Sequence, residues 1–398
     1  MEPDLDRLRA AVEHLAAIER PSASAGEREA AEWISARLRE AGCQAEVEQE
    51  RAHGTIWWPL GLLTATAGLA GLALAPRGPR GRLVATVVAA AATRGIVDDI
   101  TGGPHWFRRL LPRRSTWNAV ARAGDPAGAR TLVLVAHHDA AHGGAVFDPR
   151  PQRAFARAFP RRFERTQTAP PIMALVVAGP ALVAAAAAAG RPGLLRAGVL
   201  LCAGSVAAFA DIGVRRVVPG ANDNLSAVAV LLELARALQE EPVPGLRVLL
   251  VSTGSEESFM EGMRGFVARH GAELARSQAR VLCVECVGSP ALVLLEGEGM
   301  LRMNDYSAEL RTLVAEAAAG AGVPLRRGLR SSMATDGLIS LRAGLATATL
   351  ASIDRYKMAS NYHQQTDTAE NVDYATVARA VVVCRAVARA LAASGADR

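Results

Sequence analysis

Cysteine is scarce in this chain of 398 residues, and its pattern excludes one class of protein. The five cysteines are Cys43, Cys202, Cys283, Cys286 and Cys384, an odd and scattered set that argues against a disulfide scaffold. The closely spaced pair, Cys283 and Cys286, has no second pair nearby and falls in an apolar run. We therefore interpret these two thiols as buried packing groups rather than as a structural zinc or redox site.

A signal peptide and a nucleic-acid-binding motif are also missing. The chain opens with the polar letters MEPDLDRLRA, which do not have the pattern of a secretory leader. The formal net charge of the chain is +6, and much of it comes from arginine clusters that lie beside apolar runs. We therefore expect a lipid bilayer with anionic lipid, and no nucleic acid, to be the partner of this charge.

Two long runs lack charged residues altogether, Ile56–Pro76 with 21 residues and Ala169–Gly190 with 22. This length matches a membrane-spanning helix. Each run is followed by a short turn of arginine, proline and glycine and then by a second apolar stretch, Leu83–Thr93 or Leu194–Ala210. The pattern predicts two helical hairpins with four membrane spans. The alternative is that these segments are buried alanine-rich helices of an enlarged soluble domain.

Two segments beside these runs, Pro104–Ser115 and Arg150–Arg165, mix aromatic residues with arginine. In the second segment, Phe155 and Phe159 are four positions apart and would share one helical face. Pro160 would end or kink that helix. Such segments are typical of a bilayer interface. A solvated basic face and a lid over the active site are the alternative interpretations.

The distribution of arginine predicts the orientation of the chain in a membrane. More arginines lie near the spans on the side of the larger domain than at or near the hairpin turns. The domain side has Arg108, Arg109, Arg113, Arg114, Arg153, Arg157, Arg161, Arg162, Arg165, Arg215 and Arg216. The hairpin turns have Arg77, Arg80, Arg82 and Arg191, with Arg196 at the edge. Because the more positive side stays inside, we place the larger domain and both termini in the cytosol. A soluble cytoplasmic protein is the alternative.

Five short patches hold side chains that suit metal binding: His137-His138-Asp139, Gly220–Asn224, Glu256-Glu257, Glu285 and Tyr362-His363. Three of these patches follow or end apolar runs that are typical of buried strands, Thr131–Ala136, Arg247–Ser252 and Val281–Glu285. Ligands of open α/β sheets bind outside the carboxyl ends of the strands. The patches are therefore expected to meet at one edge of a sheet.

The residue types in these patches indicate a two-metal hydrolase. Two zinc ions about 3.5–4 Å apart need imidazole and carboxylate ligands and a bridging group. A further carboxylate that does not bind metal must accept a proton from the attacking water and pass it to the leaving amine. The adjacent pair Glu256-Glu257 suits this division of labour, with one carboxylate on the metal and its neighbour facing the water.

The patches and their surroundings resemble a known family. The stretches VAHHDA, PGANDNLSAVAVLLELARAL, STGSEESFMEGMRGF, VECVG and NYHQQTDTAENVD are similar to those of the di-zinc aminopeptidases, whose relatives include glutamate carboxypeptidase II and glutaminyl cyclase. The resemblance covers roughly residues 1–53, 115–148 and 213–398. It implies that His137, Asp223 and Glu285 bind one zinc ion. Asp223, Glu257 and His363 would bind the other, so that Asp223 bridges the two.

The same resemblance implies further roles. Glu256 would be the general base, Asp139 would orient His137, and Tyr362 would help to hold the oxyanion. The chain departs from the family at Glu285, where the family usually has aspartate, and the additional methylene group changes the reach of that carboxylate. We expect His138 and His142 to make local hydrogen bonds, and Asp336 and Asp367 to be second-layer or turn-capping residues.

The expected fold is α/β, with a mixed, mostly parallel sheet flanked by helices as in zinc exopeptidases and with inserted transmembrane helical hairpins. The predicted helices are Asp4–Glu19, Glu27–Ala41, Ser226–Gln239, Ser307–Ala321 and Tyr374–Ala393, with Asn224 or Ser226 as the cap of the third. The separation of His137 from Asp223 exceeds what the family commonly needs, which indicates an insertion. The predicted division is residues 1–53, 115–149 and 213–398 for the peptidase domain, 54–114 for the first membrane hairpin, and 150–212 for the basic segment and second hairpin.

The resulting functional hypothesis is a membrane-associated, zinc-dependent exopeptidase, most simply an aminopeptidase, that hydrolyses a peptide substrate. A carboxypeptidase or other amidohydrolase on the same site is the second enzyme hypothesis. A glutaminyl cyclase fits less well, because that branch works with one zinc ion and this chain keeps both histidine ligands. A non-catalytic membrane receptor or scaffold with a peptidase fold is the hypothesis of another class, and the complete ligand set argues against it.

Overall fold

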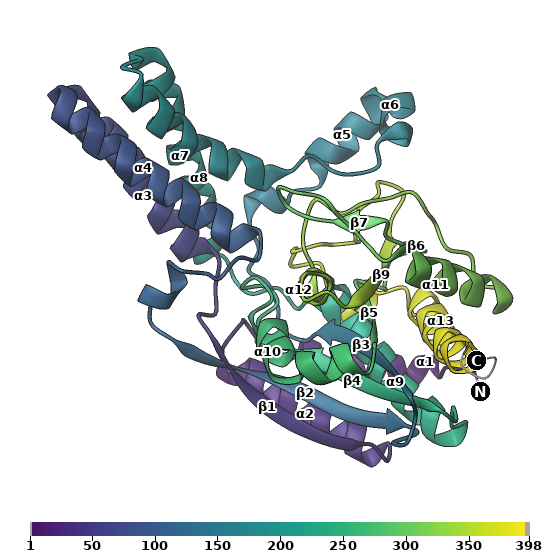
Figure 1. The fold of residues 1–398 in the computed structure, drawn as a ribbon. Helices are drawn as coiled ribbons and strands as arrows, with labels where there is room; N and C mark the ends of the chain where they lie inside the picture. Colours follow the sequence, from purple (N-terminus) through teal and green to yellow (C-terminus); the bar gives the residue numbers. More distant parts are fainter. Residues whose placement is uncertain (1, 395–398) are drawn as a thin grey trace.

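A seven-stranded sheet forms the centre of the structure, a computed structural model that describes residues 2–394 (Figure 1). In spatial order its strands are β1 (Gln44–Ala52), β2 (Arg114–Gly124), β4 (Leu246–Thr253), β3 (Arg130–His137), β5 (Arg280–Glu285), β9 (Ala346–Ile353) and β6 (Ala291–Leu294). The four central strands β4, β3, β5 and β9 are parallel, whereas β1, β2 and β6 pair antiparallel at the edges. The predicted mixed α/β sheet is therefore confirmed.

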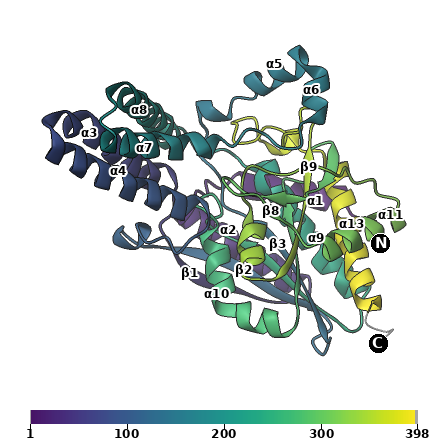
Figure 2. The same cartoon turned by 45° about the horizontal axis from the view of Figure 1, so that its top comes forward.

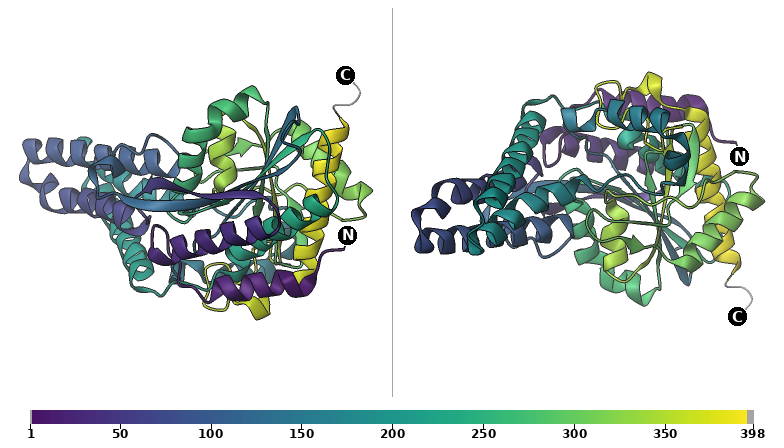
Figure 3. Two further views of the ribbon diagram at one scale, coloured as in Figure 1. Left: turned by 90° about the horizontal axis from the view of Figure 1, so that it is seen from below. Right: turned by 90° about the horizontal axis from the view of Figure 1, so that it is seen from above.

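The alternation of side chains along β3 explains why helices cover both faces of the sheet. Leu132 and Leu134 enter one hydrophobic core, and Val133 and Val135 enter another. The first core is closed by α1 (Leu5–Ala16), α2 (Ala25–Glu40), α9 (Ser226–Glu240), α11 (Ala308–Gly320) and α13 (Tyr374–Ala393). The second is closed by α10 (Glu261–Arg276) and α12 (Asp336–Arg342). Figure 3 shows α1 and α2, in purple, and α10, in green, on opposite sides of the sheet.

Four further helices form a bundle that projects from this domain (Figures 1 and 2). They are α3 (Trp57–Ala73), α4 (Pro79–Ile100), α7 (Ile172–Ala188) and α8 (Pro192–Val214), and α3 and α7 each pack against both α4 and α8. Glycine allows α7 and α8 to approach each other closely. A Cβ atom at Gly198 of α8 would lie only 2.8 Å from the backbone nitrogen of Val183 in α7. Small residues of this kind are common where membrane helices meet.

The bundle carries apolar side chains on its outside as well as at its centre. Leu69, Leu72, Leu83, Val87 and Leu200 are each at least 60% exposed. By length and composition, Trp57–Arg77 and Pro192–Val214 could cross a membrane, although core helices of soluble proteins have the same properties. The helix α7 has only 17 residues, and α4 contains several arginines and aspartates. The prediction of four membrane spans therefore has weak support, and from two helices.

A short basic segment connects the domain to the second hairpin. It consists of α5 (Arg150–Ala158) and α6 (Pro160–Arg165), and the break between the two helices falls at Pro160 as predicted. The small strands β7 (Gly297–Glu298) and β8 (Asn304–Asp305) form a separate two-stranded ribbon.

One arginine beside the spans is buried, and one sequence-based expectation, the cap of α9, is wrong. Arg108, which was counted among the arginines beside the spans, is fully buried and forms an ion pair with Asp99 at 2.7 Å. The cap of α9 is also different, because neither Asn224 nor Ser226 caps that helix with its side chain. Asn224 instead binds the end of β5, where its amide donates to Glu285 and its carbonyl accepts from the backbone of Cys286. These contacts lie far apart in sequence and leave no local pattern.

Candidate metal centre

The predicted metal-binding side chains meet at the carboxyl edge of the sheet. His137 is the last residue of β3, and Glu285 is the last residue of β5. Glu257 lies in the loop after β4, and His363 lies in the loop after β9. Asp223 lies in the irregular turn Ala221–Leu225 that leads into α9. Because the central strands are parallel, their ends bring these segments to one place.

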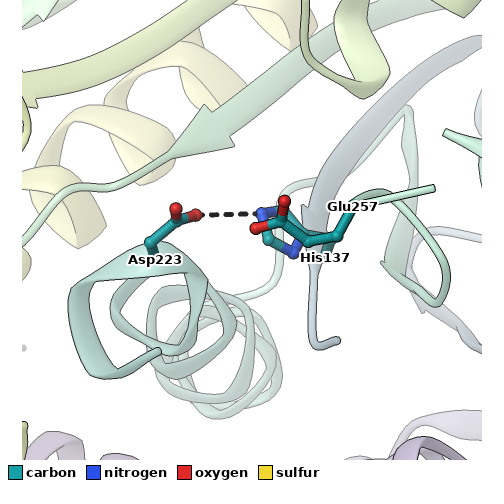
Figure 4. Close-up of side chains that lie close together, drawn as sticks. All are labelled: His137, Asp223 and Glu257. Carbon is teal, nitrogen blue, oxygen red and sulfur yellow. Dashed lines mark ion pairs between the residues drawn. The ribbon is translucent and has the colours of Figure 1, made fainter. Parts of the chain in front are cut away.

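Asp223 stands at the centre of the cluster, and its two carboxylate oxygens face different histidines. Its Oδ1 atom is 3.2 Å from Nε2 of His137, and its Oδ2 atom is 3.2 Å from Nε2 of His363. Figure 4 shows Asp223 and His137 pointing toward each other, with Glu257 beside them. One carboxylate between two imidazoles is the arrangement that a bridging ligand requires.

A second carboxylate stands on each side of this bridge. On one side, Oε1 of Glu285 is 3.5 Å from Nε2 of His137. On the other side, Oε1 of Glu257 is 3.2 Å from Nε2 of His363. Ligand atoms of His137, Asp223 and Glu257 all lie within 4.8 Å of one another. The structure thus brings all five predicted ligands together, in two groups that share Asp223.

Asp139 connects the histidine of β3 with the glutamate pair. Its side chain lies 3.4 Å from Nδ1 of His137, and its backbone carbonyl lies 3.1 Å from the same nitrogen. The two carboxylate oxygens of Asp139 accept hydrogen bonds from the backbone N–H groups of Glu256 and Glu257 at 3.0 and 3.1 Å. Asp139 is therefore placed to orient His137, and it also holds the loop that carries Glu256.

Glu256 differs from its neighbours in having a free carboxylate. The side chain is only partly buried, and its oxygens make no hydrogen bond or ion pair within residues 2–394. The pKa of Glu256 lies well above its ordinary value, because loss of solvent around the carboxylate raises it more than the charge of His137 lowers it. A carboxylate without a structural partner, next to the ligands, is free to exchange a proton.

Tyr362 packs against His363 with stacked rings whose centroids are 3.9 Å apart. Its hydroxyl makes no hydrogen bond with the described residues, and burial together with the charges of Asp223 and Glu257 raises its pKa well above the usual value. The ring of Tyr362 therefore lies beside the cluster. His138 and His142 make hydrogen bonds as expected, but with residues distant in the sequence: the hydroxyl of Ser252 and the backbone carbonyl of Arg215.

The loop that carries Asp223 is held by Asp367. The two oxygens of this buried carboxylate accept hydrogen bonds from the backbone N–H groups of Asn222 and Asp223 at 2.8 and 3.0 Å. Asp336 is also buried nearby and accepts a hydrogen bond from the hydroxyl of Thr253. Asp367 thus fixes the backbone of the turn that carries Asp223, whereas the sequence left open whether it would support the site or cap a turn.

Sequence reasoning missed Arg20, which is fully buried behind the cluster. Its guanidinium donates hydrogen bonds to the backbone carbonyls of His138, Pro219 and Gly220 at 2.6, 2.7 and 2.9 Å. Burial lowers its pKa to about 10, while nearby acids including Asp139 act in the opposite direction. Arginine is rarely buried completely, so an arginine is expected to be exposed unless the sequence indicates otherwise. No local pattern around Arg20 indicates that it is buried.

The residues present fit a bound cation. The Oδ2 atom of Asp223 and the Nε2 atom of His363 are buried and have no hydrogen-bond partner among the described residues. Burial would lower the pKa of His363, but the charges of Glu257 and Asp223 raise it to about 10. Such a surplus of negative charge calls for a positive ion, and imidazole with carboxylate oxygens is a donor set that zinc prefers.

Comparison with known proteins agrees with this chemistry. The profile of peptidase family M28 matches residues 205–388, which include Asp223, Glu256, Glu257, Glu285 and His363. No curated protein matches the chain. Among solved structures, the chain is similar to an aminopeptidase from Aneurinibacillus sp. strain AM-1, with 13% identity and a TM-score of 0.55 over 98% of this chain and 93% of the other.

Two further structures extend the comparison. A zinc-dependent exopeptidase from Parabacteroides distasonis has 13% identity and a TM-score of 0.54 over 96% of this chain and 97% of the other. A glutaminyl cyclase from Fimbriiglobus ruber has 12% identity and a TM-score of 0.57 over 98% of this chain and 96% of the other. At this identity the likeness shows the fold, and together with the family match it supports a zinc peptidase. The match of the family M28 profile over residues 205–388, just under half of the chain, agrees with the resemblance to the di-zinc aminopeptidase family that the sequence motifs indicated.

Proposed function

We propose that this chain is an aminopeptidase that binds two zinc ions and acts at a membrane. The observation that carries the proposal is Asp223, whose two oxygens each face a different histidine with a glutamate beside it. His137, Asp223 and Glu285 would hold one ion, and Asp223, Glu257 and His363 would hold the other. When bound, such ions lower the pKa of a water molecule and polarise the carbonyl of the scissile bond.

The side chains of the chain itself would then move the proton and hold the charge. Glu256 takes the proton from the attacking water and returns it to the leaving nitrogen, for which its free carboxylate is suited. Asp139 keeps His137 and the backbone of Glu256 in position through its hydrogen bonds. Tyr362, whose ring lies beside the cluster, would donate a hydrogen bond to the oxyanion.

The membrane part of the proposal rests on the helical bundle. Several large apolar side chains are exposed on its outer surface, and two of its helices are long enough to cross a bilayer. We place residues 54–114 and 150–212 as insertions into a peptidase domain made of residues 1–53, 115–149 and 213–398. With the arginine-rich side inside, the catalytic domain would face the cytosol. Removing Arg108 from the count leaves that asymmetry in place.

The first experiment compares wild type with Glu256→Gln for zinc content and for hydrolysis of aminoacyl fluorogenic amides. We expect about two zinc ions per chain in both proteins and a loss of activity of roughly 10²–10⁴-fold in the variant. The matched control is Glu29→Gln, because Glu29 is an exposed glutamate of α2 far from the cluster in sequence.

Each other outcome points to a different function. A folded wild-type protein that binds no zinc when zinc is supplied would overturn the enzyme proposal and favour a scaffold. Bound zinc with hydrolysis only of peptides that have a free carboxyl terminus would indicate a carboxypeptidase. Cyclisation of an N-terminal glutaminyl peptide, without hydrolysis, would indicate the activity named for the cyclase structures.

A further inference from the structure

The segment of α5 and α6, residues 150–165, is called the basic arm below. Phe155 and Phe159 lie together on it with ring centroids 5.5 Å apart, and they are 38% and 55% exposed. Two neighbouring phenylalanines that face solvent are unfavourable in water, since burying each would remove a large apolar area. They form an apolar patch that the described part of the chain does not cover.

The basic arm also carries positive charge without a matching negative charge. Six arginines and a single acid, Glu164, lie within it. Arg161, Arg162 and Arg165 are exposed, and their side chains make no hydrogen bond or ion pair within residues 2–394. A surface that combines free arginines with exposed phenylalanines is complementary to anionic lipid headgroups and the acyl chains just below them.

The arm is fixed in place by the peptidase domain. The Nζ atom of Lys357, the only lysine of the chain, donates to the backbone carbonyls of Phe163, Glu164 and Thr166 at 2.7–2.9 Å. Gln152 donates to the carbonyl of Tyr356 at 2.8 Å. These contacts hold the end of α6 and the start of α5, so the exposed face of the arm has a defined direction.

The arm lies beside the helical bundle rather than on the far side of the domain. Figures 1 and 2 show α5 and α6 extending sideways from the base of the bundle, at a steep angle to its helices. Its end continues into α7 within a few residues, and the exposed Ile172 and Leu175 open that helix. If the bundle crosses a bilayer, a helix in this place runs along the bilayer surface.

We propose that the basic arm binds the surface of an anionic bilayer, with Phe155 and Phe159 in the headgroup region and Arg161, Arg162 and Arg165 on lipid phosphates. The inference rests on the proposed membrane insertion of the bundle, and it is independent of the catalytic proposal. Phe147, just before the arm, contacts His363 with ring centroids 4.3 Å apart. Docking of the arm therefore places the metal centre beside the lipid surface.

The test uses the full chain in nanodiscs, made either of neutral phosphatidylcholine or of a mixture with anionic phosphatidylglycerol. All five native cysteines are buried, so a thiol at exposed Ala158 can be labelled selectively with an environment-sensitive fluorophore. We expect Ala158→Cys to show a blue-shifted emission and quenching by spin-labelled lipid in the anionic nanodiscs. The same label at exposed Ala272→Cys of α10 serves as the control and should stay in water.

Charge removal then tests the source of the binding. Each arginine near an anionic surface favours binding by roughly fivefold, so Arg161→Gln, Arg162→Gln and Arg165→Gln together should abolish the quenching of the Ala158 label. The matched control replaces three exposed arginines elsewhere, Arg28, Arg276 and Arg302, by glutamine and should keep it.

Two outcomes would overturn the proposal. One is an Ala158 label that remains in water in anionic nanodiscs that hold the wild-type protein. The other is an equal loss of quenching in the two triple variants. Zinc content and amide hydrolysis, measured on the same nanodiscs, test the catalytic proposal separately. An active enzyme whose basic arm does not bind the bilayer would contradict this inference and leave the catalytic proposal in place.

Discussion

The candidate metal centre depends on fully buried charged residues that are not themselves predicted metal ligands. Asp139, Asp367 and Arg20 each hold a segment of backbone, and each does so through charged groups whose hydrogen bonds are the strong ones. Such residues fix where the ligand atoms point. Their removal should change metal affinity without removing a ligand.

The change Asp367→Asn tests this at one residue. The carboxylate accepts from two backbone N–H groups, of Asn222 and Asp223, but an amide side chain can accept with only one of its two terminal atoms. The freed N–H group and the misplaced amide should disturb Asp223. We expect a loss of zinc affinity of about 10–100-fold, measured by competition with a chelator. Unchanged affinity, equal to that of the exposed control Glu370→Gln, would contradict this role.

A second prediction concerns Glu298, which is buried in β7 and accepts hydrogen bonds from Thr335. Burial raises its pKa from 4.5 to about 8. Between these values the folded protein keeps a proton that the unfolded chain has lost, so this group makes the protein less stable as the pH rises. The Glu298→Gln side chain cannot ionise, so this loss of stability should be absent from the variant. As the pH rises, its free energy of unfolding should increase relative to that of wild type by up to about 1.4 kcal/mol per pH unit.

Urea unfolding at pH 5, 6, 7 and 8 measures this difference. The wild-type and variant stabilities should diverge as the pH rises, with the variant ahead at pH 8. The exposed Glu309→Gln serves as control and should run parallel to wild type. A parallel course for Glu298→Gln as well would show that Glu298 is ionised in the folded protein throughout this range.

At the scale of elements, periodicity in the sequence predicts most of the peptidase domain. The strands expected at Thr131–Ala136 and Arg247–Ser252 are β3 and β4, each longer by one residue at either end in the structure. The helix expected at Tyr374–Ala393 has those bounds as α13. These elements bury apolar side chains at a regular spacing, and that spacing can be read from a short stretch of sequence. The turn before α9 was mispredicted because its side chains bond to β5, a distant strand.

The packing of the bundle gives a prediction for two glycines of the same helix. A Cβ atom at Gly198 in α8 would collide with the backbone of Val183 in α7, whereas Gly204 has open space around it. Gly198→Leu should therefore separate α7 from α8 and destabilise the bundle, by roughly 1–3 kcal/mol or more. Gly204→Leu should not. Thermal unfolding in detergent compares the two, and equal melting temperatures would contradict the packing described.

At the scale of the whole molecule, a buried network of charges joins the bundle to the peptidase domain. Arg108 forms an ion pair with Asp99 of α4 and lies 3.7 Å from Glu261 of α10. Glu261 in turn accepts from His53 and from Ser258, close to the loop of the glutamate pair. Burial alone would raise the pKa of Glu261, but its hydrogen bonds and the charge of Arg108 lower it to about 2. The junction is therefore held by ionised groups.

Removing the cation from this junction should be costly. Arg108→Met would leave Asp99 buried without its ion-pair partner and remove a cation that lies beside Glu261, and breaking a buried pair in this way costs about 3–5 kcal/mol. The neighbouring Arg109 is exposed, so Arg109→Met should change stability by less than about 0.5 kcal/mol. The melting temperatures of the two variants give the comparison. If Arg108→Met and Arg109→Met both change the melting temperature by a similar small amount, Arg108 is not essential to the junction.

The sequence by itself determined the order and identity of the candidate metal-binding patches, and their resemblance to the di-zinc aminopeptidases. It could do so because ligand chemistry demands particular residue types, and because parallel strands carry their ends to one edge of the sheet. It also determined five helices of the domain and three of its four central strands, β3, β4 and β5, whose apolar periodicity is a local property.

Only the tertiary structure decided which oxygen of Asp223 faces which histidine, and that Arg20 and Arg108 are buried rather than exposed. It also decided how the four helices of the bundle pack and where the basic arm points. Each of these depends on contacts between residues that are distant in the chain. The free energy of such contacts comes from desolvation and from charge pairing in the folded protein, and neither leaves a periodic pattern along the sequence.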